Sequence, residues 1–381
     1  MRKNIIFLLF FGIIGTILRF CYINSVNVKS KCYAVNDKCT AEAMVTMERS
    51  TGRILYSKNE DKILPMASTT KIITAIVAIE SGFDLDEKHL ITKDMTGIEG
   101  SSIYLKAGEK LSLRELLYGL MLRSGNDSAV AIAKIISGSI ESYVRRMNLF
   151  CLNLGLHNTN IVTVNGLNDK NHYTTASDLG KITCYALSNS VFAEIVKTKE
   201  KVISNDLDTK NKCRLLKNKN KLLKKLEGAD GVKTGYTMKA GRCFVGSATR
   251  NNMQIICVVL NCKEMFEEAI KFIDKAFKEY SLVLYMRNGN IDNYERNKKA
   301  QNSAIIIKKD IFLPLNKDEI EKVKISYSFF DKQTKDNQIG YVYFLIENNL
   351  IFSEKIYTIN SEKHSKNGDF KNHFYKIIRA F

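Results

Sequence analysis

Three short motifs occur in a fixed order along the chain. Ser-Thr-Thr-Lys stands at residues 68–71, Ser-Gly-Asn at 124–126 and Lys-Thr-Gly at 233–235. Ser68 is the only serine with a lysine three positions later, and no other Thr-Gly pair follows a lysine. Ser-x-Asn is common, but the ordered set of three is specific. Together the motifs indicate a serine acyl-transfer site, so the fold must join segments 56 and 109 residues apart.

The first motif suits a serine nucleophile. One helical turn brings Ser68 and Lys71 to the same face, and a serine at a helix start lies among unpaired backbone N–H groups. A serine hydroxyl is a weak nucleophile and needs a base within hydrogen-bond reach. Lys71 must be neutral to accept the proton, and burial together with a second cation, Lys233, would lower its pKa. We predict Ser68 as the nucleophile and Lys71 as its base.

The second motif is expected in a turn between two helices. Ser124 can relay a proton to a leaving amine, and the Asn126 amide can hydrogen-bond both Lys71 and a substrate peptide group. Taken alone, a Ser-Gly-Asn turn is usually only a turn, so this assignment depends on the other two motifs.

The third motif is expected on an edge strand. Lys233 and Thr234 could there hold a substrate carboxylate, and Gly235 lets a substrate backbone approach closely because it has no side chain. Taken alone, a serine at a helix start and a Lys-Thr-Gly strand end also have purely structural explanations.

The hydrophobic pattern predicts an α+β fold. Two strand-like runs over 43–57 precede a block of helices, which includes an apolar helix over 72–79 and one opened by a capping box at 112. Strand-like runs return over 232–260 and an amphipathic helix follows to 280. The two ends of this catalytic domain, 41–280, could share one antiparallel sheet.

The residues after 280 have a different hydrophobic pattern. Short β-like runs with polar turns predict a small β-rich domain over 286–360; they lie at 304–313, 323–330, 340–346 and 350–359. The tail, 361–381, places aromatic residues at helical spacing among basic ones, and is expected either to lie in a membrane interface or to pack on its own domain.

The chain begins with basic residues and an uncharged apolar run over 5–18. This pattern predicts that residues 1–25 are a signal peptide or an uncleaved anchor, and that the protein is exported. The net charge is +18, and the densest basic stretch, 197–225, is either a solvated loop or a surface that attracts anionic wall polymers. Nucleic acid is not expected as a partner of an exported chain. Nine cysteines without a Cys-x-x-Cys pair support neither a zinc site nor a thioredoxin-like motif. No metal or cofactor is expected.

Segments around the motifs resemble one family of enzymes. Residues 65–71, 171–176, 218–223 and 228–237 are similar to segments of the low-molecular-weight D-alanyl-D-alanine carboxypeptidases, penicillin-binding serine peptidases of family S11. The resemblance is strong over 41–280 and weaker in the β-rich region. It implies a β-lactamase/transpeptidase-like catalytic domain. It also implies the site residues Ser68 (acylated), Lys71, Ser124, Asn126, Lys233, Thr234 and Gly235, with the backbone N–H groups of Ser68 and Tyr236 as the oxyanion hole.

The implied reaction removes the terminal D-alanine from a peptidoglycan stem pentapeptide through a serine ester that water hydrolyses. β-Lactams would acylate the same serine, and association with the membrane surface is expected. One departure borders the site: residues 163–167 read Thr-Val-Asn-Gly-Leu where many relatives have Asn-Pro-His-Gly-Leu. This loop is expected to affect substrate preference and turnover.

Other functions compete with this one. A class A β-lactamase needs a glutamate for deacylation, and no glutamate lies between Glu141 and Glu194. Endopeptidase or transpeptidase activity would use the same acyl-enzyme and stays open. A wall-binding or β-lactam-sensing protein with a degenerate site is disfavoured, because all six motif residues are intact.

Overall fold

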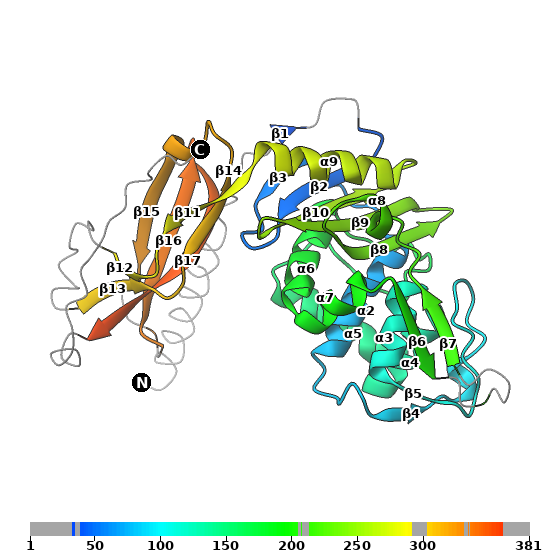
Figure 1. Ribbon diagram of the computed structural model, residues 1–381. Coiled ribbons are helices and arrows are strands. Elements are labelled where there is room, and N and C mark those ends of the chain that lie inside the picture. The colour runs from blue at the N-terminus through cyan, green and yellow to red at the C-terminus, as the bar shows by residue number, and fades with distance from the viewer. Residues whose placement is uncertain are drawn as a thin grey trace, which may run out of the picture.

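The computed structural model describes residues 33–34, 39–204, 207, 213–291, 303–330, 334 and 336–360. The predicted signal or anchor (1–25) and the tail (361–381) lie outside the described residues. Figure 1 shows a larger part with sheet and helices, and a smaller part made of strands. Of the helices in the described ranges, none is long and apolar enough to cross a membrane.

The larger part is built on a six-stranded sheet in the order β1-β3-β2-β10-β9-β8. The strands are β1 (Tyr33–Ala34), β2 (Ala43–Glu48), β3 (Ile54–Lys58), β8 (Ala229–Thr237), β9 (Gly241–Arg250) and β10 (Met253–Leu260). Strand β10 pairs antiparallel with β2, with Val258 opposite Val45. The two ends of the catalytic region therefore share one sheet, as predicted. Strand β8 lies at the edge of the sheet, as predicted. The pairing of β1 with β3 is parallel.

Helices cover both faces of this sheet, which explains why β2 is buried along its whole length. Val45 and Met47 pack into one core and Met44 into the other, as the two-residue period of a strand requires. The helix block lies on one face and α9 on the other (Figure 1). The helices are η1 (Ala67–Thr70), α2 (Lys71–Ile79), η2 (Lys93–Met95), α3 (Leu113–Leu122), α4 (Asn126–Ser137), α5 (Ile140–Asn153), α6 (Ala176–Ser188), α7 (Ser190–Lys197), α8 (Leu222–Lys225) and α9 (Met265–Glu279).

The predicted capping box is confirmed. Ser112 and Glu115 form the capping box of α3. Helix α7 was not predicted, because Asn189 ends α6 and at once caps α7, accepting hydrogen bonds from the N–H groups of Val191 and Phe192.

The basic stretch over 197–225 is not simply the solvated loop considered above. It contains the antiparallel pair β6 (Glu200–Ser204) and β7 (Cys213–Lys217), followed by α8. Ile203 and Leu216 point into the main core, whereas Val202 and Leu215 are exposed. A short pair (β4, Lys88–Leu90; β5, Lys110–Ser112) lies elsewhere in this part.

The smaller part confirms the predicted β-rich region. It holds a five-stranded sheet, β12-β13-β17-β16-β15, and the pair β11–β14. The elements are β11 (Ser281–Met286), β12 (Gly289–Asn290), β13 (Ser303–Ile307), β14 (Ile311–Leu315), η3 (Ile320–Lys322), β15 (Val323–Phe329), β16 (Gln338–Ile346) and β17 (Asn349–Asn360). The expectation of one continuous run over 304–313 is wrong. The polar residues 308–310 separate β13 from β14, and the two strands join different sheets.

Candidate active site

Ser68 lies where the sheet meets the helix block. It belongs to the 3-10 turn η1, which leads directly into α2. Ala67, just before it, has a positive φ of 48°. One helical turn later, Lys71 places its Nζ 3.0 Å from Ser68 Oγ. The predicted nucleophile and base are therefore within hydrogen-bond reach.

Lys71 is fully buried, with its amine held at three points. Besides Ser68 Oγ, Nζ contacts Asn126 Oδ1 at 2.7 Å and the Asn165 carbonyl oxygen at 2.6 Å. Burial, helped by the charge of Lys233, lowers the pKa of Lys71 well below its usual value. A neutral amine has two hydrogens, which suit the two fixed carbonyl oxygens. Its lone pair is then left for the proton of Ser68.

The second motif contributes Ser124 and Asn126 at the start of α4. Ser124 has a positive φ of 64° and lines the cleft. The Asn126 amide nitrogen donates to the carbonyl of Glu99 at 2.5 Å, which turns Oδ1 toward Lys71. A Cβ at Gly100 would lie 2.7 Å from this nitrogen, so Gly100 provides the space that the amide occupies.

The third motif runs along the edge strand β8. A Cβ at Gly235 would lie 3.0 Å from the backbone nitrogen of Ser68, so the strand passes directly beside the start of η1. Thr234 and Gly235 line the cleft, and the Tyr236 side chain is mostly exposed. Lys233 is buried and donates to the Thr234 carbonyl at 2.8 Å. Burial, followed by the charge of Lys219, lowers the pKa of Lys233 to about 7.

Two positions near the nucleophile were not predicted as part of the site. One is the Asn165 carbonyl, which belongs to the unusual 163–167 loop and contacts Lys71. Gly166 next to it has φ +84°, and a Cβ there would lie 2.0 Å from the Ala67 carbonyl oxygen. The departure from the family sequence therefore contacts Lys71, the predicted base. The sequence showed that this loop is unusual. It could not show that a backbone carbonyl of the loop contacts Lys71, because every residue type has such a carbonyl.

The other position is His172, in a segment noted above only for its family resemblance. Its Nδ1 accepts from the N–H groups of Val162 and Thr163 at 3.0 and 3.2 Å. Its Nε2 therefore carries the proton and lies 2.8 Å from Thr70 Oγ1. Burial lowers the pKa of His172 to about 4, so the ring is neutral near pH 7. It ties the 163–167 loop to the turn that carries Ser68.

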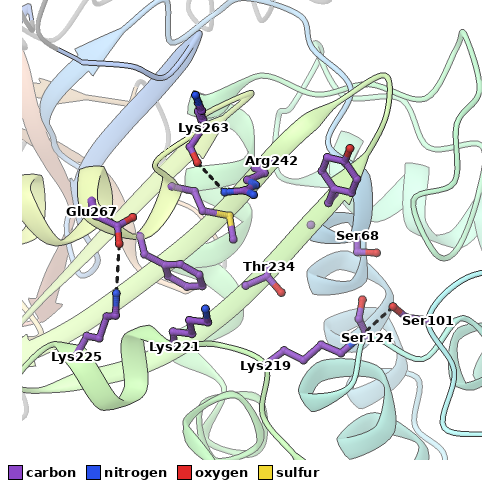
Figure 2. A pocket seen from close by; sticks show the side chains of 14 residues that line it. Ser68, Ser101, Ser124, Lys219, Lys221, Lys225, Thr234, Arg242, Lys263 and Glu267 are labelled. Atoms are coloured by element: carbon purple, nitrogen blue, oxygen red, sulfur yellow. Dashed lines mark hydrogen bonds and ion pairs between the residues drawn. The ribbon is translucent and has the colours of Figure 1, made fainter.

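A cleft of about 560 Å³ opens over these groups. Figure 2 shows Ser68 and Ser124 at one end of the cleft and basic side chains at the other end. Thr234 lies between these two ends. Lys219 donates to Ser101 Oγ at 3.2 Å beside Ser124. Among the residues that the structure describes, no three His, Cys, Asp or Glu side chains form a group able to hold a metal ion.

Comparisons with known proteins agree with this geometry. The family profile described as D-alanyl-D-alanine carboxypeptidase matches residues 30–264, and that of the penicillin-binding protein 5 C-terminal domain matches residues 281–364. D-alanyl-D-alanine carboxypeptidase DacF of Bacillus subtilis (strain 168) is 35% identical over 269 residues, covering 68% of this chain and 68% of that protein. The D-alanyl-D-alanine carboxypeptidase of Streptomyces sp. (strain K15) is 40% identical over 228 residues, covering 56% of this chain and 78% of that protein.

Solved structures show the same fold. Penicillin-binding protein 5 from Haemophilus influenzae matches with a TM-score of 0.71 and 28% identity, covering 86% of this chain and 98% of that one. The Streptomyces K15 DD-transpeptidase matches with a TM-score of 0.61 and 34% identity, covering 64% of this chain and 99% of that one. The predicted fold class and family resemblance are confirmed. The chain belongs to the D-alanyl-D-alanine carboxypeptidase family of serine peptidases.

Proposed function

We propose that Ser68 is the residue acylated when this carboxypeptidase removes the terminal D-alanine from peptidoglycan stem pentapeptides. The observation that carries this proposal is the contact of Lys71 Nζ with Ser68 Oγ at 3.0 Å, in a site where burial lowers the pKa of the amine well below its usual value. Lys71 takes the proton of Ser68 as Oγ attacks the penultimate D-alanine carbonyl.

The remaining motif residues act on the charges that form during this step. The N–H groups of Ser68 and Tyr236 stabilise the oxyanion. Ser124 passes the proton to the leaving amine as the amide bond breaks. Asn126 keeps Lys71 in place through its Oδ1 contact. Water then attacks the ester and releases the shortened peptide.

The substrate carboxylate is expected to bind at Thr234, with the charge of Lys233 behind it. β8 is the last strand of the six-stranded sheet, and an extended peptide can pair with such an edge. Close approach is possible because Gly235 has no side chain. Binding of the carboxylate favours protonated Lys233, and this makes the reaction depend on pH.

We expect kcat/KM for a D-Ala-D-Ala peptide to be bell-shaped in pH. Activity is lost at low pH because Lys71 becomes protonated and is no longer a base. Burial, helped by the charge of Lys233, lowers the pKa of Lys71 well below its usual value, so the deprotonated base forms at a lower pH than in an exposed lysine. With a pKa of about 7, Lys233 becomes neutral as the pH rises through 7, and kcat/KM falls.

A peptide ending in D-alaninamide is the matched control for this profile. It has no carboxylate, so its kcat/KM should keep the acid limb and lose the alkaline limb. In the complex with the carboxylate substrate, the alkaline limb of kcat should lie at higher pH than that of kcat/KM. An identical alkaline limb for both peptides would remove Lys233 from the proposed role.

The proposed nucleophile is tested by labelling the purified chain, beginning at residue 41, with a fluorescent penicillin. We expect one covalent adduct, located by mass spectrometry in the peptide that contains Ser68, and release of D-alanine from a stem pentapeptide. An adduct at any other residue would contradict the assignment. Rapid loss of the label would instead favour β-lactamase activity, and peptide dimers would favour transpeptidation.

We also propose that the protein is exported and acts on the outer side of the membrane. The basic and apolar start over 1–25 supports export, and peptidoglycan lies outside the cytoplasm. The proposed division is a catalytic domain over 41–280, a β-rich domain over 286–360 and an amphipathic tail over 361–381 that associates with the membrane surface.

A further inference from the structure

The cleft continues beyond the place expected for the terminal carboxylate. Past Thr234 it is lined by Lys221 and Lys225, at α8, and by Met265, Phe266 and Glu267 at the start of α9. Figure 2 shows Lys221 between Thr234 and the Lys225–Glu267 pair. A leaving D-alanine ends at its own carboxylate, so it does not extend to this far end.

The far end of the cleft carries a positive charge with no direct partner. Lys225 is paired with Glu267, with Nζ 3.2 Å from Oε1. The Lys221 side chain makes no hydrogen bond or ion pair with the residues that the structure describes. Arg242 lines the same cleft and donates to the Lys263 carbonyl at 3.0 Å. The basic side chains that line this end of the cleft therefore outnumber its single carboxylate, that of Glu267.

Apolar surface lies beside the free ammonium. Met265 and Phe266 are half-buried at the cleft wall, and the Phe266 ring packs 4.9 Å from that of Phe244 between centroids. A chain of methylene groups can rest on this wall while a terminal anion reaches Lys221. The combination suits an aliphatic side chain that ends in a carboxylate.

We propose that Lys221 selects acyl donors whose leaving residue carries a second carboxylate on its side chain. This inference rests on the proposed function, because the far end is the leaving-group side only if Ser68 is the nucleophile. The chemistry is the same: the Ser68 ester forms, the amide bond breaks, and the leaving amine takes the proton. The released product is then a dicarboxylate amino acid or a peptide that begins with one.

The test compares donor peptides that differ only in charge at the leaving residue. Donors ending in D-Ala-D-Glu and D-Ala-D-2-aminoadipate are paired with the neutral side-chain amide of each, and D-Ala-D-Ala is measured alongside. Contacts between exposed charges contribute about 0.2–1 kcal/mol. We therefore expect the charged donor of at least one pair to have a kcat/KM about 1.4- to fivefold above its amide, and added salt to reduce this preference.

Lys221→Met should bring the charged-to-neutral ratio to about one while leaving kcat/KM for D-Ala-D-Ala unchanged. Lys224→Met is the matched control, because it removes the same charge from an exposed residue of α8 that does not line the cleft. It should leave the ratio as in the parent chain.

Three results would overturn the inference. The first is a charged-to-neutral ratio of kcat/KM equal to one in the parent chain, and the second is a ratio that Lys221→Met does not change. The third is an equal fall of this ratio in Lys224→Met, which would indicate a general effect of positive charge on the protein surface. Saturable binding of polyphosphate that Lys221→Met abolishes, with a donor ratio of one, would assign the far end to anionic polymers instead. If the folded chain cleaves no donor, D-Ala-D-Ala included, the proposed function itself fails.

Discussion

Replacing Lys71 with methionine is expected to slow the acylation of Ser68 by about 10²- to 10⁴-fold, the usual contribution of a positioned general base. Methionine fills a similar volume but cannot accept the proton from Oγ. It also leaves Asn126 Oδ1 and the Asn165 carbonyl without their shared donor. The second-order rate constant for labelling by a fluorescent penicillin measures the effect, and D-alanine release should fall in parallel.

Two further variants separate the possible causes. Ser68→Ala sets the background, because it lacks the acylated oxygen. Lys71→Arg keeps a hydrogen-bond donor for the two carbonyl oxygens but stays protonated, so it should be as slow as Lys71→Met. If Lys71→Met labels within tenfold of the parent rate while folded, a different group is the base.

The sequence predicted side chains that the fold brings together, because the chemistry expected of them depends on side-chain type. Ser68 and Lys71 meet because one helical turn places them on one face, and this local geometry follows from their spacing. That the two ends of the catalytic region share one sheet followed from the pattern of strand-like runs before and after the helix block. These features depend on short-range periodicity and on the order of elements.

Other parts of the site depend on contacts between distant backbone groups. The Asn165 carbonyl holds Lys71 across 94 residues of sequence, and any residue type has such an oxygen. The His172 ring connects the loop to the turn of Ser68 by accepting from two backbone N–H groups of the loop and by hydrogen-bonding to Thr70. No pattern of residue types predicts which backbone atoms will face a buried amine. Only the folded chain shows that the unusual loop contacts Lys71, the predicted base.

The β6–β7 hairpin shows a second reason for a wrong prediction. In each strand of this hairpin a buried residue, Ile203 or Leu216, stands next to exposed residues. Eleven basic residues between 197 and 225 obscure this alternation in the sequence. Composition favoured a solvated loop, but these two buried side chains, together with contacts such as the ion pair of Arg214 with Glu109, hold the hairpin against the rest of the domain. The same basic stretch ends at α8, where Lys221 faces the cleft.

Arg53→Ala is expected to destabilise the protein by about 3–5 kcal/mol, because it leaves a buried carboxylate without its partner. Arg53 lies just before β3 and is almost fully buried. Its Nη1 lies 3.0 Å from Glu319 Oε2, and Nη2 contacts the other carboxylate oxygen. Nη1 also donates to the Pro314 carbonyl. This one side chain therefore joins the catalytic sheet to the β-rich part.

The thermal midpoint of Arg53→Ala should fall by on the order of 10 °C, and limited proteolysis should cut between the two parts sooner. Arg114→Ala is the matched control, since Arg114 pairs with Asp86 in two hydrogen bonds at the surface and should barely change the midpoint. A double variant, Arg53→Met with Glu319→Leu, should recover much of the loss, because apolar side chains can replace a buried ion pair. Equal midpoints for Arg53→Ala and Arg114→Ala would show that the two parts are held together by their apolar contacts, with no net contribution from the buried pair.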